Sequence, residues 1–128
     1  MSKKILLVED TIDIRSALRL LLEMRGYTVI EAGDGLEALE LAVKHLPDLI
    51  LMDLAMPVHD GVAATRAIRA EKSTSLIPII AVSSHEGSMK TSAIIAGCNE
   101  VMTKSAFMAA FDSTLAKYLP LSVPSDNS

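Results

Sequence analysis

Three carboxylates stand directly after short apolar runs of the sequence. Glu9 and Asp10 follow Ile5–Val8, and Asp53 follows Leu49–Met52. In a parallel sheet the carboxyl ends of neighbouring strands meet at one edge, so these acids would converge there. Carboxylates that lie close together raise one another's pKa unless a cation compensates their charge, and an all-oxygen set of ligands suits Mg²⁺. The sequence therefore predicts a magnesium site, although any one of these acids alone would also fit the role of turn former or helix cap.

A cation and two hydroxyl groups end two further apolar runs. Ser83 and Ser84 follow Ile77–Val82, and Lys104 follows Val101–Thr103. We expect these side chains to reach the same rim as the acids, because all the runs would be strands of one parallel sheet. An isolated lysine at such a position would usually be no more than a solvated charge.

Strand-like and helix-like segments alternate along the chain. The strand-like segments are short and rich in β-branched residues, and they cover Ile5–Val8, Thr28–Ala32, Leu49–Met52, Ile77–Val82 and Val101–Thr103. Apolar residues recur at helical spacing over residues 14–22, 36–46, 62–70, 86–96 and 107–118. The order is (βα) repeated five times. It predicts an α/β, doubly wound, flavodoxin-like three-layer sandwich whose five-stranded parallel sheet has the order 2-1-3-4-5.

Residues with special backbone roles mark several helix ends. Gly26 and Gly97 stand where a C-terminal glycine takes a positive φ, and Asp34-x-x-Glu37 resembles a capping box. Asp60 is expected to cap the third helix and not to bind metal.

Composition and charge disfavour several classes of function. The chain has 16 acidic and 12 basic residues, and no run of Lys or Arg is long enough to follow a phosphate backbone, so direct nucleic-acid binding is disfavoured. The run Ile5–Val8 is too short for a signal peptide or a membrane span. The single cysteine, Cys98, favours a reducing, cytoplasmic setting and a packed structural role for its thiol.

The order and spacing of the polar residues match a known family. The matching motifs are Glu9-Asp10, Asp53-x-x-Met56-Pro57-x-x-x-Gly61, Pro78-Ile-Ile-Ala-Val-Ser83-Ser84 and Lys104. Together they resemble the receiver domain of bacterial two-component response regulators, in particular its single-domain, chemotaxis-regulator-like members. The resemblance runs from about Lys4 to Tyr118. We therefore expect a receiver domain over residues 1–119 and a flexible C-terminal tail over residues 120–128.

The resemblance implies that Asp53 is the phosphoacceptor. Its carboxylate would attack the phosphorus of a phosphohistidine on a sensor histidine kinase or a histidine phosphotransfer protein, which gives an aspartyl phosphate. Asp10 and Asp53 would ligate Mg²⁺ directly and Glu9 through water, while the backbone carbonyl of Ala55 would supply a further oxygen.

Four residues would surround the phosphoryl group in such a site. The resemblance implies that Lys104, the Ser83 hydroxyl and the Ser84 N–H bind its oxygens beside the backbone of Ala55. His85 occupies the second position after the Ser/Thr, which influences how fast water removes the phosphoryl group. Met56-Pro57 and Gly61 would shape the loop into the third helix, with glycine supplying a permissive backbone.

The function implied is that of a regulatory switch and not of an enzyme acting on other molecules. The domain would catalyse only its own phosphorylation and dephosphorylation. Phosphorylation would change how a downstream protein binds to the face formed by the fourth helix, the fifth strand and the last helix.

Two positions depart from the family pattern. Val101 stands where the family usually has the Tyr or Phe that moves inward on phosphorylation, so the readout would depend on Ser83 and its loop. Ser105 stands where the family usually has a proline, often after a cis bond. We predict a trans Lys104–Ser105 bond, or a strained cis bond, because non-proline cis costs about 2.5–4 kcal/mol. Ser105 is also a candidate cap for the last helix.

Three other interpretations compete with a phosphorylated receiver domain. A flavin-binding domain of this topology would need a Ser/Thr/Gly-rich phosphate loop where the chain has Glu9-Asp10. An aspartyl-phosphate hydrolase would resemble Asp-x-Asp at the nucleophile, where the second position here is Ala55. A degenerate receiver that binds partners without phosphorylation stays open because of Val101 and Ser105. The start of the sequence and the short tail favour a stand-alone regulator over a fragment of a hybrid kinase or a multidomain regulator.

Overall fold

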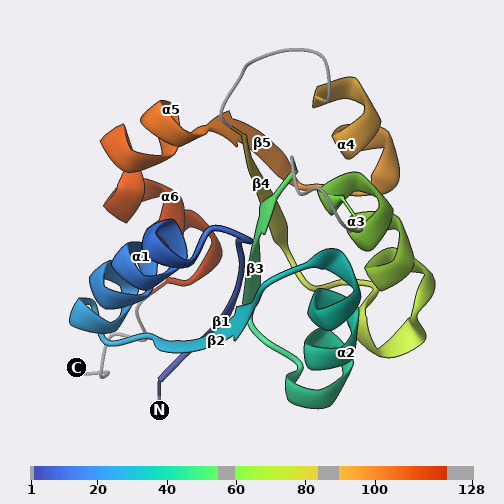
Figure 1. Cartoon of the computed structure of the whole chain (residues 1–128), viewed down its shortest axis with the longest axis horizontal. Coiled ribbons are helices and arrows are strands. Elements are labelled where there is room, and N and C mark those ends of the chain that lie inside the picture. The colour runs from blue at the N-terminus through green and yellow to red at the C-terminus, as the bar shows by residue number, and fades with distance from the viewer. Residues whose placement is uncertain (1, 55–59, 84–89, 121–128) are drawn as a thin grey trace.

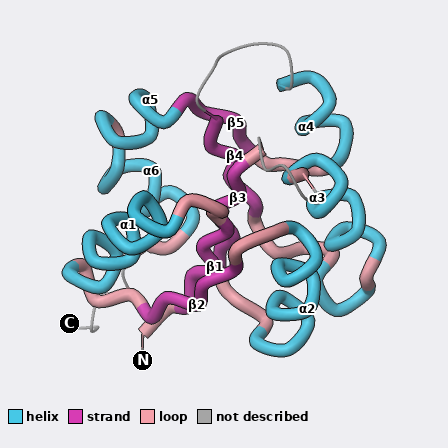
Figure 2. Tube along the Cα trace, in the orientation of Figure 1, coloured by secondary structure: helices cyan, strands magenta, loops and turns pink. Residues whose placement is uncertain are grey.

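Five parallel strands form the central layer of the protein. The computed structural model describes residues 2–54, 60–83 and 90–120. Its strands run in the order β2-β1-β3-β4-β5, as predicted (Figures 1 and 2). Their bounds are β1 (Lys4–Val8), β2 (Thr28–Ala32), β3 (Leu49–Asp53), β4 (Ile79–Ser83) and β5 (Glu100–Thr103).

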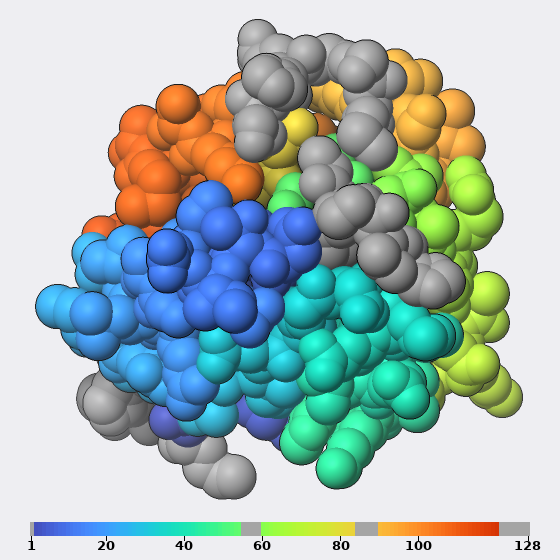
Figure 3. Space-filling model, in the orientation of Figure 1, coloured from blue at the N-terminus to red at the C-terminus, as the bar shows by residue number. Residues whose placement is uncertain are grey.

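Helices cover both faces of the sheet. Helices α1 (Ile12–Met24), α5 (Lys104–Ala109) and α6 (Phe111–Tyr118) lie on one side, and α2 (Gly35–His45), α3 (Gly61–Ala70) and α4 (Lys90–Ala96) lie on the other (Figure 1). A short 3₁₀ helix, η1 (Lys72–Thr74), follows α3. The space-filling view shows the atoms of α1 and α5 on one side of the molecule and those of α2 and α3 on the other (Figure 3). No helix in the described part of the chain is long and apolar enough to span a membrane.

Alternating strand residues divide the core into two clusters. Leu6, Ile50 and Ile79 belong to the cluster under α2, α3 and α4, while their neighbours Leu7 and Leu51 belong to the cluster under α1, α5 and α6. Successive side chains of a strand point to opposite faces, and here both faces are covered. This is why the strands read as continuous apolar runs in the sequence.

The predicted helix ends are present with one change. Gly26 and Gly97 take positive φ values of 89° and 120°. Asp34 accepts a hydrogen bond from the Glu37 N–H at 2.8 Å, as in a capping box. The reciprocal bond is shifted, because the Glu37 carboxylate accepts from the Gly33 N–H at 2.7 Å instead of from the N–H of Asp34. Asp60 caps α3 by accepting from Ala63 N–H.

The C-terminal helix differs from the prediction. Residues 107–118 were expected to form one helix, but the backbone leaves helical geometry at Ala110 and separates α5 from α6. Phe107 and Phe111 still pack edge to face in the same cluster, with ring centroids 5.4 Å apart. The spacing of four residues keeps both rings on one face whether or not the helix is interrupted, so apolar periodicity could not reveal the break.

The cap of α5 was also assigned to the wrong residue. Helix α5 begins at Lys104, and the Thr103 hydroxyl accepts from the Ala106 N–H at 3.0 Å. Ser105 therefore lies inside the first turn and is not the cap. No described peptide bond is cis, so the Lys104–Ser105 bond is trans, the first of the two alternatives given above.

Strand β4 begins two residues later than expected. The Ile77 N–H donates to the Thr74 carbonyl at 3.2 Å, in the turn after η1, instead of joining the sheet. Pro78 has no N–H to donate to a neighbouring strand. The first four residues expected in the fourth helix, 86–89, lie outside the described part of the chain, and the described helix begins at Lys90.

Candidate functional site

The three predicted carboxylates meet at the carboxyl edge of the sheet. Val8 of β1 pairs with Met52 of β3, so the residues that follow, Glu9 and Asp53, emerge side by side. Asp10 follows Glu9 in the connection to α1. One oxygen from each of the three carboxylates lies within 4.8 Å of the others. The parallel pairing of β1 and β3 therefore builds the acidic cluster that the sequence predicted.

Burial makes one member of this cluster, Glu9, costly to charge. The side chains of Glu9 and Asp53 are buried, with 3% and 5% of their surface exposed. Burial raises the pKa of the Glu9 carboxyl above its usual value, and the charge of Asp53 raises it further. The Thr11 N–H, which donates to Glu9 Oε2 at 3.2 Å, and the charge of Lys104 oppose this rise in the pKa.

Lys104, which follows the edge strand β5, brings a positive charge to the acids. Its Nζ lies 3.3 Å from Glu9 Oε1, and its side chain is about one-third exposed. It is the residue after β5, at the start of α5. The lysine was predicted to reach this rim, but its ion pair with Glu9 was not anticipated, because it depends on the conformation of a long, flexible side chain.

Strand register places Ser83 between the acids and the lysine. Asp53 pairs with Val82 of β4, and Ser83 pairs with Thr103 of β5. Each predicted residue therefore lies one step further along the same edge, from Asp53 to Ser83 and then to Lys104. Ser83 is buried, with 9% of its surface exposed.

Three predicted site residues lie outside the described residues. They are Ala55, Ser84 and His85. Their roles stay predictions. Val101, the position without the usual aromatic residue, pairs with Ala81 and is partly buried against the cluster under α3 and α4.

Gly61 serves the site through a close approach of two backbones. The Gly61 N–H donates to the Leu54 carbonyl at 3.3 Å. A Cβ on Gly61 would lie 2.2 Å from the carbonyl oxygen of Asp53, which no side chain could tolerate without a shift of the backbone. The sequence predicted that Gly61 is needed for its permissive backbone, and this reason was wrong, because among the described glycines only Gly26 and Gly97 have positive φ. Glycine is needed here because a Cβ has no room.

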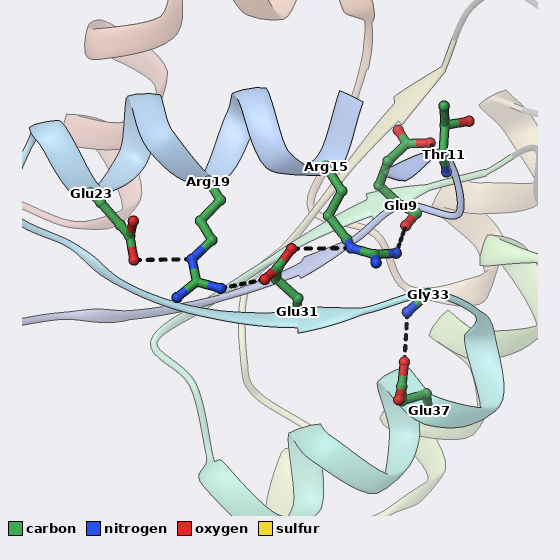
Figure 4. Close-up of polar contacts among 8 residues, drawn as sticks. All are labelled: Glu9, Thr11, Arg15, Arg19, Glu23, Glu31, Gly33 and Glu37. Carbon is green, nitrogen blue, oxygen red and sulfur yellow. Dashed lines mark hydrogen bonds and ion pairs between the residues drawn. The ribbon is translucent and has the colours of Figure 1, made fainter. Parts of the chain in front are cut away.

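Sequence reasoning missed the groups that hold the Glu9 backbone. The Arg15 Nη1 donates to the backbone carbonyl of Glu9 at 2.8 Å, and its Nε lies 3.1 Å from Glu31 Oε1 (Figure 4). Arg15, Arg19 and Glu23 recur every four residues along α1, which marks one face of a helix. That spacing could have drawn attention to a charged stripe, but not to its contact with the acidic turn.

A cavity of about 230 Å³ lies beside the cluster, between α1 and α5. Most of its lining is apolar and includes Ile14 and Leu18 of α1 and Phe107 and Met108 of α5, but Glu9, Asp53 and Lys104 also line it. The apolar part of this lining does not suit a metal ion or a phosphate. The charged groups that could bind either of them are those at the edge of the sheet.

Known proteins resemble this chain in both sequence and architecture. The family of the response regulator receiver domain matches residues 5–115. A polar-differentiation response regulator, DivK of Brucella ovis, is 35% identical over 120 residues, which cover 93% of this chain and 98% of the relative.

Solved structures agree with this match. The chemotaxis protein CheY4 of Vibrio cholerae is 30% identical and superposes with a TM-score of 0.85, covering 93% of this chain and 100% of CheY4. The receiver domain of a sensor histidine kinase from Pseudomonas aeruginosa PAO1 is 33% identical, with a TM-score of 0.85 over 92% of this chain and 98% of that domain. That structure has a magnesium ion coordinated in its active site cleft.

Sequence, strand order and the acidic edge of the sheet thus lead to one assignment. The chain belongs to the response regulator receiver domain family, the regulatory domains of two-component systems.

Proposed function

We propose that this chain accepts a phosphoryl group on Asp53 and acts as a phosphorylation-dependent signalling switch. The observation that carries the proposal is the convergence of Glu9, Asp10 and Asp53 within 4.8 Å at the edge of the sheet that Lys104 also reaches. The domain catalyses only its own phosphorylation and dephosphorylation. Its receiver unit covers residues 1–119, while the tail predicted over residues 120–128 lies, from residue 121 on, outside the described residues.

The donor set of the site fits Mg²⁺. Glu9, Asp10 and Asp53 offer hard oxygen ligands, and Lys104 is a single positive charge beside three carboxylates. Burial first, and then the charge of Asp53, raise the pKa of Glu9, and this supports a cation as the partner of these carboxylates. Asp10 and Asp53 would hold the ion directly, Glu9 would hold it through water, and the backbone carbonyl of Ala55, which lies outside the described residues, would supply a further oxygen. When bound, Mg²⁺ supplies positive charge next to the phosphoryl oxygens.

Phosphoryl transfer in this proposal is an in-line displacement. A carboxylate oxygen of Asp53 forms a bond to phosphorus while the bond from phosphorus to the histidine nitrogen breaks, and the nitrogen keeps the electron pair. Lys104, the Ser83 hydroxyl and the Ser84 N–H bind the phosphoryl oxygens beside the backbone of Ala55. The position of Lys104 Nζ, 3.3 Å from Glu9, supports this role, because the ammonium group already lies at the acidic edge.

The proposed donor is a sensor histidine kinase or a histidine phosphotransfer protein. The family membership of the chain and the name of its relative DivK as a response regulator support a partner of this kind. The proposal includes a cytoplasmic location, which the single cysteine of the sequence favours. His85 tunes the rate at which water removes the phosphoryl group.

The output surface is the face formed by α4, β5 and the C-terminal helical segment that the structure divides into α5 and α6. Phosphorylation draws Ser83 toward the phosphoryl group and shifts the segment that follows β4. Val101 replaces the usual aromatic residue on β5, so the readout depends on this segment and on the packing of the helices. A downstream protein binds this surface with an affinity that depends on phosphorylation.

One assay tests the proposal. The protein is incubated with Mg²⁺ and a small acyl phosphate, and the intact mass is measured. We expect one added phosphoryl group on the wild type and on Asp60→Asn, a control that keeps a capping side chain beside the site. We expect none on Asp53→Asn or when Mg²⁺ is chelated. An unmodified wild type, or equal gains in wild type and Asp53→Asn, would refute it.

A further inference from the structure

Arg15 connects the acidic turn, Glu9-Asp10, to the rest of the fold. Its guanidinium group donates from Nη1 to the backbone carbonyl of Glu9 at 2.8 Å. On the other side of the same residue, the Glu9 N–H donates to the Ala32 carbonyl of β2 at 3.1 Å. Both backbone groups of Glu9 are therefore held, and so is the peptide plane that leads from Glu9 to Asp10. A shift of that plane would move both carboxylates relative to Asp53.

The guanidinium group is itself fixed by β2 and by the loop that follows it. Arg15 Nε lies 3.1 Å from Glu31 Oε1, and the side chains of this pair are 20% and 26% exposed. Figure 4 shows Glu31 between the guanidinium groups of Arg15 and Arg19. A Cβ on Gly33 would lie 3.2 Å from Arg15 Nη1, so glycine leaves room for the arginine at this point. Charge-assisted bonds of this kind are stronger than neutral ones.

Arg19 has the same chemistry and lacks the contact with the turn. It bonds to Glu31 Oε2 and to Glu23 Oε2, and both of these partners are carboxylates away from the acidic cluster. The two arginines therefore share Glu31, and only Arg15 reaches Glu9. Variants of Arg15 and Arg19 can therefore be compared to distinguish an effect on the Glu9-Asp10 turn from a general effect of losing ion pairs along α1.

We infer that Arg15 is a positioning residue, which fixes the turn between Glu9 and Asp10 and thereby sets the affinity of the acidic site for Mg²⁺. The inference rests on the proposed function of this site. A turn that is already ordered loses less conformational freedom when an ion binds. Without the bond from Arg15, part of the binding free energy would be spent on ordering the Glu9 carbonyl and the Asp10 side chain.

A direct Mg²⁺ titration of the unphosphorylated protein tests the inference. Binding is followed by the amide NMR signals of the acidic edge in wild type, Arg15→Met and Arg19→Met. We expect Arg15→Met to bind Mg²⁺ about tenfold more weakly, the scale of one lost hydrogen bond to a charged group. We expect Arg19→Met to stay within about twofold of wild type, since the two ion pairs that it loses belong to an exposed side chain and do not reach the acidic cluster. Arg15→Lys, which keeps one donor, should bind between wild type and Arg15→Met.

The direction of the change in Mg²⁺ affinity distinguishes a positioning role of Arg15 from an effect of its charge. Loss of a positive charge near the site would by itself strengthen the binding of a cation. Weaker binding by Arg15→Met can therefore come only from the loss of order, provided that the spectra show a folded protein. With acyl phosphate, the Mg²⁺ concentration that gives half the maximal phosphorylation rate should rise about tenfold, while the rate at saturating Mg²⁺ stays within about twofold of wild type.

Three results would overturn the inference. They are Mg²⁺ affinity equal to wild type in Arg15→Met, an equal weakening in Arg19→Met, and a wild-type protein that binds no Mg²⁺. Failure of the proposed function looks different, because a wild type that binds Mg²⁺ but gains no phosphoryl group would sink that function. The comparison of Mg²⁺ affinities would still decide the role of Arg15.

Discussion

Glu9 carries a carboxyl group whose ionisation is disfavoured by its surroundings. Burial first, and then Asp53, raise the pKa of its carboxyl above the usual value. The folded protein therefore holds this proton more tightly than the unfolded chain does. The stability that this adds is fully present below the pKa of the unfolded chain, and it is lost as the pH rises through the higher pKa of the folded protein.

The variant Glu9→Gln tests this pH dependence without metal. Because glutamine does not titrate, the free energy of unfolding of the variant minus that of wild type should increase as the pH rises through the pKa of Glu9 in the folded protein. Urea denaturation at a series of pH values, with a chelator present, measures this difference. A difference that does not change with pH would show that Glu9 is as easily charged in the folded protein as in the unfolded chain.

Gly61 is a second residue whose identity follows from the site. The added methyl group of Gly61→Ala would meet the Asp53 carbonyl oxygen at 2.2 Å. Because backbone must move to make room, we expect a loss of about 1–3 kcal/mol in the free energy of unfolding, the usual cost of overpacking. Urea denaturation measures it. An unchanged midpoint would mean that the start of α3 is not packed as tightly against Asp53 as the structure shows.

At the scale of elements, the assignment of Thr103 as the cap of α5 can be tested by removing the hydroxyl of Thr103 or that of Ser105. Thr103 Oγ1 accepts from the Ala106 N–H at 3.0 Å, whereas Ser105 lies in the first turn and is exposed. Thr103→Ala should cost about 0.5–2 kcal/mol in unfolding free energy, the range for loss of an N-cap. Ser105→Ala should change it by less than about 0.5 kcal/mol, as expected for a surface position. Thermal or urea denaturation compares the two, and a larger loss in Ser105→Ala would reverse the assignment of the cap.

The elements were predictable where burial determines the pattern of residues. All five residues of β3, Leu49–Asp53, are buried, and such a run has few alternatives to a central parallel strand. The break at Ala110 and the late start of β4 were not predictable. Both depend on local backbone bonds, such as that from Ile77 N–H to Thr74, which leave no trace in apolar spacing.

The site was predictable to the same extent. Glu9, Asp53 and Lys104 could be placed together because each directly follows or ends a strand, and the order of the strands fixes the ends of neighbours. The contacts made by long side chains could not be placed. Arg15 reaches a backbone carbonyl, and Lys104 reaches Glu9, through conformations that residue type and spacing do not determine.

At the scale of the whole molecule, helices from both faces of the sheet meet at its acidic edge. Glu9 leads into α1, Lys104 starts α5, and the Asp53 carbonyl meets the start of α3, so the acidic edge joins elements from both faces. A chemical change at Asp53 would therefore occur next to helices on both faces of the sheet. This arrangement suits a domain whose output is a shift in packing and not a released product.

We expect Asp53 itself to be the residue that becomes an aspartyl phosphate. The most direct measurement is to phosphorylate the protein with Mg²⁺ and an acyl phosphate, reduce it with borohydride, and analyse its peptides by mass spectrometry. Borohydride converts an aspartyl phosphate to homoserine, so we predict homoserine at position 53 and at no other aspartate. Homoserine at Asp10 or Asp60, or none at all in a protein that has gained a phosphoryl group, would contradict the account.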